Sequence, residues 1–78
     1  MLTKERILDW LEGVEIDEDV VFEEDVNEVC DRIFDLYEKG KLSDEIVREL
    51  EEGENFSGSW VLDELEIEYE VDDRYYWN

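Results

Sequence analysis

The chain has 78 residues and a formal net charge of −20, with 27 Asp and Glu against 7 Lys and Arg, one Cys, and neither His nor Pro. This length favours a single domain over residues 1–78, because so short a chain cannot divide its apolar residues between two cores. Apolar residues make up 42% and aromatic residues 13%, which predicts a folded acidic domain rather than a disordered chain. No apolar run exceeds three residues, so we expect a soluble, cytoplasmic protein without a membrane-spanning segment or signal peptide.

The composition excludes several classes of function. Without His, the chain lacks Ser-His-Asp and Cys-His catalytic systems and every His-ligated metal site. Its negative field repels nucleic acid and anionic membranes. Cys30 lies on the apolar side of a predicted helix, which favours a core position over a reactive thiol. We therefore expect a protein that is not an enzyme and that uses no cofactor or metal.

The N-terminal part of the chain predicts a helix over residues 3–12, with Thr3 as N-cap and Gly13 ending it. Its apolar stripe is formed by Ile7, Leu8 and Leu11. In the following residues 15–22 apolar side chains fall on even positions, which is compatible with a short strand. Its acidic residues 17–19 are equally compatible with a loop.

Two further helices are predicted in the middle of the chain. Over residues 23–39, apolar side chains recur at spacings of three and four, and Gly40 ends this central helix. Ser43 is the expected N-cap of a third helix, with acidic residues in its first turn. This third helix ends near Glu52 and Gly53.

The C-terminal part predicts a β-hairpin. Apolar and acidic residues alternate strictly over residues 65–72, a two-residue period that is typical of a strand with one buried face. Residues 56–62 are the predicted partner strand, and the turn falls at residues 63–64. The predicted fold is therefore α+β, with three helices followed by an antiparallel hairpin.

Two segments carry most of the negative charge. Residues 15–31 hold nine acidic residues and residues 49–73 hold eleven, with no basic residue in either segment. Clustered like charges destabilise a compact chain, so this clustering indicates a binding surface. The residues predicted to bind a partner are Glu15, Asp17, Glu18, Asp19, Glu23, Glu24, Glu51, Glu52, Glu54, Glu66, Glu68, Glu70 and Asp72.

The acidic side of the predicted C-terminal strand is the most informative of these groups. Alternate residues of a strand project from one face about 6.6–6.8 Å apart. Phosphates along one nucleic-acid strand are separated by a comparable distance of roughly 7 Å. The acidic row of Glu66, Glu68, Glu70 and Asp72 is therefore predicted to imitate consecutive phosphates.

In its size, charge, lack of His and acidic patterning, the chain resembles the small DNA-mimic inhibitors of phages and mobile elements. These include anti-CRISPR proteins, anti-restriction proteins and uracil-DNA glycosylase inhibitors. The resemblance implies an inhibitor that occupies the basic DNA-binding or RNA-binding groove of a nuclease complex in the host cytoplasm. Its expected partner is a basic nucleic-acid-binding protein, and the inhibitor itself is expected to be a monomer or small homo-oligomer.

Other interpretations of the same features remain open. An antitoxin, immunity or regulatory protein would also bind one basic partner, but away from that partner's nucleic-acid site. A solvating domain from a high-salt organism is less compatible with the excess of Glu over Asp, 17 to 10. Residues 17–19 lack the spacing of an EF-hand calcium loop. The aromatic residues Trp60, Tyr75, Tyr76 and Trp77 fit either a core or an exposed anchor.

Overall fold

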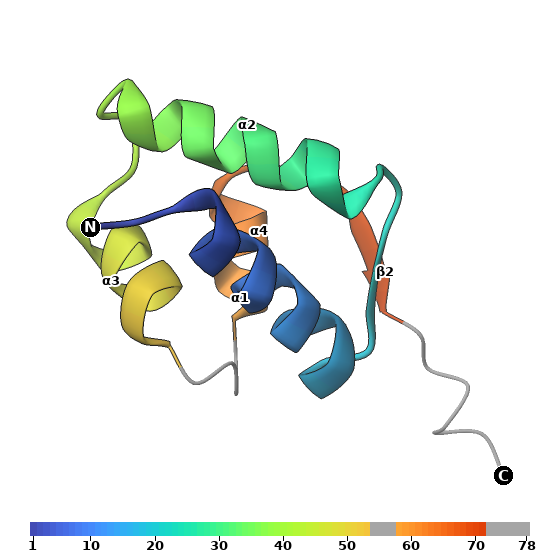
Figure 1. The fold of residues 1–78 in the computed structure, drawn as a ribbon. Coiled ribbons are helices and arrows are strands. Elements are labelled where there is room, and N and C mark those ends of the chain that lie inside the picture. The colour runs from blue at the N-terminus through green and yellow to red at the C-terminus, as the bar shows by residue number, and fades with distance from the viewer. Residues whose placement is uncertain (54–57, 72–78) are drawn as a thin grey trace, which may run out of the picture.

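A computed structural model of the protein describes residues 1–53 and 58–71, which form a mixed α+β fold. In chain order the elements are α1 (Lys4–Asp17), β1 (Val20–Phe22), α2 (Val26–Glu38), α3 (Asp44–Glu52), α4 (Ser59–Glu64) and β2 (Tyr69–Val71). α1 packs against α2, α3 and β1, and α2 crosses above it in Figure 1. The paired strands lie at the opposite end of the molecule from α3 (Figure 1).

α1 begins where the sequence predicts but runs further. The Thr3 side chain accepts a hydrogen bond from the backbone N–H of Arg6 at 3.2 Å, which confirms Thr3 as the N-cap. The predicted end at Gly13 is wrong, because the helix continues to Asp17. A glycine inside a helix costs only about 1 kcal/mol relative to Ala, and the additional turn buries Val14 completely.

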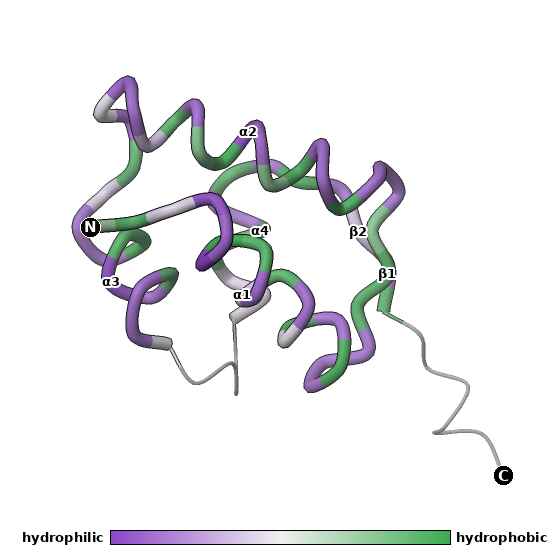
Figure 2. Tube along the Cα trace, viewed as in Figure 1, coloured by the Kyte–Doolittle hydropathy of each residue, from purple (hydrophilic) through white to green (hydrophobic). Residues whose placement is uncertain are grey.

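α2 starts later than predicted and ends at the predicted glycine. The Asp25 carboxylate accepts from the backbone N–H of Asn27 at 2.7 Å, so residues 23–25 precede the helix instead of forming its first turn. Gly40 has a φ of +70°, a left-handed conformation that glycine adopts without a Cβ penalty. The helix is amphipathic, and Figure 2 shows hydrophobic and hydrophilic residues alternating turn by turn along it.

α3 follows the prediction closely. The Ser43 hydroxyl accepts from the backbone N–H of Ile46 at 3.3 Å, which confirms Ser43 as the N-cap. The helix ends before Gly53, and it buries Ile46 and Leu50 against the core.

The predicted strand at residues 56–62 is wrong where the structure describes it, because Ser59–Glu64 forms α4. Val61 and Leu62 are both fully buried. Neighbouring residues of a strand point to opposite faces, whereas a short helix can bury both on one side. The turn after α4 places Glu66 in the left-handed region at φ +57°, and the N–H of Ile67 donates to the Leu62 carbonyl at 2.9 Å.

The sheet is formed by segments that are far apart in sequence. β1 pairs with β2 in antiparallel register, with Val20 opposite Val71, Val21 opposite Glu70 and Phe22 opposite Tyr69. The strand predicted as an alternative within residues 15–22 is thus present over Val20–Phe22, and it replaces residues 56–62 as the partner of β2. The predicted hairpin is therefore wrong, because β2 pairs with the distant β1 and not with the segment that precedes it.

The core gathers residues from every helix and from both ends of the described chain. Trp10 is its largest fully buried side chain. The buried apolar residues are Leu2, Ile7, Trp10, Leu11, Val14, Val20, Val29, Cys30, Ile33, Ile46, Leu50, Val61, Leu62 and Ile67. This core holds β1 and α4 in fixed positions, and it thereby positions the acidic segments that follow each of them.

Candidate protein-binding surface

The β1–β2 pairing brings the two acidic segments of the sequence together. Residues 15–25 flank and include β1, and residues 63–70 lead into β2. The first carries seven acidic residues and the second carries five, and neither contains Lys or Arg. Two negatively charged segments that are far apart in the sequence therefore lie side by side.

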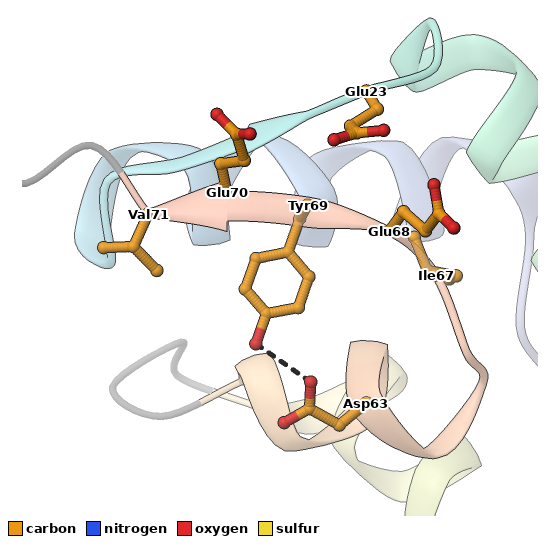
Figure 3. Close-up of a pocket in the computed structure, with 7 residues that line it drawn as sticks. All are labelled: Glu23, Asp63, Ile67, Glu68, Tyr69, Glu70 and Val71. Carbon is orange, nitrogen blue, oxygen red and sulfur yellow. Dashed lines mark hydrogen bonds between the residues drawn. The ribbon is translucent and has the colours of Figure 1, made fainter.

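A groove runs along β2 at this junction (Figure 3). It has a volume of about 640 Å³ and is open to solvent. Its lining residues, which define the β2 groove, are Glu23, Asp63, Ile67, Glu68, Tyr69, Glu70 and Val71. Four of the seven are acidic and none is basic, so the groove is suited to cationic groups rather than to anions.

The carboxylates of the β2 groove are close enough to affect one another. The negative charge of Glu68 and hydrogen bonding with its carboxyl group raise the pKa of Glu23. Partial desolvation and the charge of Glu70 raise this pKa further. Figure 3 shows the Glu23 and Glu68 carboxyl groups on the same side of β2 as that of Glu70. This repulsion is a cost of the free protein that an incoming cation would relieve.

Tyr69 connects β2 to α4 across the groove. Its hydroxyl donates to Asp63 Oδ1 at 3.0 Å (Figure 3). Burial raises the pKa of Tyr69, and the hydrogen bond to Asp63 raises it further. Neither Tyr69 nor Asp63 is among the residues predicted to bind a partner, because their approach depends on how α4 folds back on β2. The strict alternation over residues 65–72 is the one sequence signal for Tyr69, because it places this residue on the opposite side of the strand from Glu68 and Glu70.

The acidic row is shorter than predicted. Glu66 lies in the left-handed turn after α4 and not in an extended segment. Glu68 and Glu70 keep the alternation, and both are exposed. Asp72 lies outside the described residues. Within the described chain, the four-residue row is thus replaced by a cluster in which Glu23 joins Glu68 and Glu70 from the neighbouring strand segment.

One predicted binding residue has a structural role. The Glu18 carboxylate accepts from the backbone N–H of Ser59 at 2.9 Å and from its hydroxyl at 3.4 Å. It therefore satisfies a backbone donor at the start of α4, where Gly58 provides no side chain for capping. Its carboxylate is engaged within the fold.

The other acidic residues near β1 differ in their surroundings. Burial raises the pKa of Glu15, and the charge of Glu12 adds to this effect. Asp17 ends α1 and is exposed, and Asp19 has a φ of +53° in the turn before β1. A second hollow of about 340 Å³ lies along β1 and includes Glu15 and Glu24 in its lining.

Glu24 is partly neutralised by the one basic residue that approaches these acids in the described chain. Both of its carboxylate oxygens accept from Arg32 Nη2 at 2.7 Å. This hydrogen bond raises the pKa of Arg32, and the charges of Glu24, Glu28 and Glu68 add to it. The pair is exposed, so its contribution to stability is small.

The third predicted acidic group is not part of the same surface. Glu51 and Glu52 lie on α3, at the other end of the molecule from the sheet (Figure 1). The Glu51 carbonyl accepts from Arg6 Nε at 3.0 Å. Glu54 lies outside the described residues. The structure thus brings together the groups around β1 and β2 and leaves the α3 group apart.

The described residues are also informative about three other kinds of site: a reactive thiol, a metal site and a membrane-spanning helix. Cys30 is buried in the core, its thiol donates to the Lys4 carbonyl at 3.3 Å, and burial raises its pKa. In residues 1–53 and 58–71, no three acidic or cysteine side chains are arranged to hold a metal ion. No helix in that part of the chain has the length and apolarity needed to cross a membrane.

No protein-family model matches the chain, and neither the curated proteins nor the solved structures contain a significant match. The function is therefore inferred from the geometry and charge of this surface.

Proposed function

We propose that the protein is an inhibitor that imitates nucleic-acid phosphates and blocks the basic DNA-binding or RNA-binding groove of a nuclease complex. The observation that carries this proposal is the meeting of two base-free acidic segments at the β1–β2 sheet. A surface of this kind is unfavourable for the free protein and favourable only against a basic partner. Within the proposal, the protein is a phage-encoded anti-CRISPR or anti-restriction protein without enzymatic activity that acts in the host cytoplasm.

The geometry supports phosphate imitation by a cluster rather than by a long row. Glu68 and Glu70 are two residues apart in the extended segment, so their side chains are about 6.6–6.8 Å apart along it. That spacing is comparable to the roughly 7 Å between neighbouring phosphates. Glu23 contributes a third carboxylate from the adjoining segment. Three anions in this arrangement can occupy subsites that normally hold phosphates on a basic surface.

A pull-down with competition tests the proposal. The full chain is immobilised and exposed to bacterial lysate, with and without excess duplex DNA and single-stranded RNA, and bound proteins are identified by mass spectrometry. We expect a nucleic-acid-binding protein that is lost when the competitor is present. Capture of a protein that neither competitor displaces would instead support the alternative of an antitoxin, immunity or regulatory protein.

Matched variants then locate the contact surface. The triple variant Glu23→Gln, Glu68→Gln and Glu70→Gln should weaken binding to the captured partner on the order of tenfold, because three facing charges are lost. The control Glu45→Gln, Glu49→Gln and Glu52→Gln removes the same charge from α3 and should change binding little. Equal losses in both variants would show that only net charge matters.

Salt provides a second test with two opposite responses. Affinity for a basic groove should fall as NaCl rises from 50 to 500 mM, because the attraction is screened. The free energy of unfolding of the free chain should rise over the same range, because its self-repulsion is screened. Fluorescence titration and urea unfolding measure the two quantities. Binding that is independent of salt would contradict the proposal.

A further inference from the structure

β2 has one edge that β1 does not cover. β1 pairs with one side of β2, and no other strand pairs with it in the described chain. In an antiparallel pair the backbone groups of alternate residues point away from the partner strand. Either Glu70 or both Tyr69 and Val71 therefore direct their N–H and C=O groups to the free edge, where a further strand could accept and donate hydrogen bonds.

The β2 groove lies along this strand. Five consecutive residues, 67–71, line it, and Asp63 of α4 lies on its far side (Figure 3). No other backbone segment among residues 1–53 and 58–71 donates a hydrogen bond to Tyr69–Val71 or accepts one from it. The edge of β2 thus opens onto a hollow of about 640 Å³ instead of being covered by packed structure.

The charges around this edge select one kind of strand. Edge strands are often protected by Lys, Pro or a bulge, but the chain has no Pro and every charged residue lining the β2 groove is acidic. A second copy of this chain, at −20, would be repelled. A segment that carries Lys or Arg would be attracted by Glu68 and Glu70 and would relieve their repulsion with Glu23.

The two sides of β2 also differ in polarity. Glu70 points to one side of the strand, and Tyr69 and Val71 point to the other (Figure 3). Val71 is 53% exposed, which leaves apolar surface beside the edge on the side of Tyr69. An added strand would place its basic side chains beside Glu68 and Glu70 and its apolar side chains beside Tyr69 and Val71.

The geometry points to β-strand addition: the free edge of β2 receives an extended segment of the partner in which basic and apolar residues alternate. This inference rests on the proposed function for the basic character of the partner. It adds that binding uses backbone hydrogen bonds of β2 as well as charge. A short isolated segment makes few such contacts, so its dissociation constant should be on the order of 0.1–1 mM.

Peptide binding to the unaltered full chain tests strand addition. The probe is a capped octapeptide of alternating Lys and Val, titrated into ¹⁵N-labelled protein and followed by NMR. We expect the largest amide shift changes at residues 67–71, with little change on α3. An octapeptide of alternating Glu and Val should not bind. Shift changes spread evenly over all acidic segments would overturn the inference.

Backbone methylation separates strand addition from attraction by charge alone. Two further Lys-Val peptides carry N-methyl groups on either the Lys or the Val nitrogens, which removes backbone donors while keeping the charge. At least one of them should bind tenfold more weakly or worse than the parent peptide. Unchanged affinity of both methylated peptides would overturn the inference.

Charge reversal on the protein gives a matched comparison. The double variant Glu68→Lys and Glu70→Lys should bind the Lys-Val peptide at least tenfold more weakly. The double variant Glu45→Lys and Glu52→Lys on α3 should change the affinity for this peptide less than twofold. Equal losses would contradict the inference. If the peptide fails to bind while DNA still displaces a captured partner, strand addition is wrong and phosphate imitation stands. If the peptide binds but DNA does not displace the captured partner, phosphate imitation is wrong and strand addition stands.

Discussion

At the scale of single residues, Gly58 shows how closely the start of α4 approaches α1. A Cβ atom at this position would lie 2.8 Å from Cζ2 of Trp10 and 3.0 Å from Cγ2 of Val14. Trp10 is fully buried, so its ring cannot move aside without disturbing the core. Gly58 has an ordinary φ of −81°, and the requirement for glycine is therefore one of space.

Gly58→Ala should lower the free energy of unfolding by about 1–3 kcal/mol, the usual cost of overpacking. The cost should shrink in a Trp10→Phe background, because the smaller ring lacks the atom at 2.8 Å. Gly40→Ala is the control: nothing lies within 4 Å of its Cβ position, and its cost of roughly 1 kcal/mol comes from the positive φ alone. Urea unfolding of the four variants measures the coupling. Equal costs of Gly58→Ala in both backgrounds would show that Trp10 is not the obstacle.

Glu18→Ala should destabilise the protein by about 0.5–2 kcal/mol, comparable to the loss of a helix cap, because the Ser59 N–H loses its acceptor. Asp17→Ala is the matched control, since it removes the same charge from an exposed position at the end of α1. Thermal unfolding of both variants measures the difference. The prediction fails if the two variants unfold at the same temperature.

At the scale of elements, α4 decides how the C-terminal part folds. It buries the adjacent residues Val61 and Leu62 while leaving Trp60 at 38% exposure. Its left-handed end at Glu66 then turns the chain back so that β2 reaches β1. A strand in place of α4 would bury alternate residues and would leave β1 without its partner.

Leu62→Ala should lower the free energy of unfolding by about 2–5 kcal/mol, a large part of the roughly 4–12 kcal/mol expected for a domain of this size. Val61→Ala should also be costly, though less so, because it removes fewer carbon atoms. Trp60→Ala should cost the least per atom removed, since its ring is partly in solvent. Denaturant unfolding gives all three values. A small effect at either Val61 or Leu62 would indicate strand-like burial instead.

At the scale of the whole molecule, the charge is distributed unevenly. Lys4 pairs with Asp31, Arg32 with Glu24 and Lys39 with Asp35, so these three basic residues act along α2. The β2 groove is lined by acids without a basic residue. Repulsion is therefore concentrated at one end of the protein, which makes that end sensitive to pH and salt.

Stability should increase as the pH falls from 7 towards 4.5. The pKa values of Glu23 and Glu15 are raised in the folded protein above the ordinary value of 4.5, so the folded state holds more protons than the unfolded state in this range. Their stabilising effect is complete below 4.5 and is lost as the pH rises through the folded-state pKa values. Urea unfolding at several pH values measures the slope.

Glu23→Gln should flatten this slope, because the residue that Glu68 and Glu70 repel no longer titrates. High salt should flatten it in the wild-type chain as well, since the repulsion is screened. A slope that Glu23→Gln leaves unchanged would show that other carboxyl groups carry the pH dependence.

The amino-acid sequence determined the features that depend on neighbouring residues. The caps at Thr3 and Ser43 and the end of α2 at Gly40 are set by local hydrogen bonding and backbone freedom, and all three are confirmed. The exclusion of His-dependent chemistry and the two acidic segments also follow from the sequence alone. These features need no knowledge of which elements touch.

Only the tertiary structure decided which segments meet. Apolar residues 60–62 are compatible with a strand or a helix, and burial of both Val61 and Leu62 in the core selected the helix. The pairing of β1 with β2 then placed Glu23 beside Glu68 and formed the β2 groove. Contacts between residues more than forty positions apart depend on how the whole core packs, and no local period in a sequence encodes that packing.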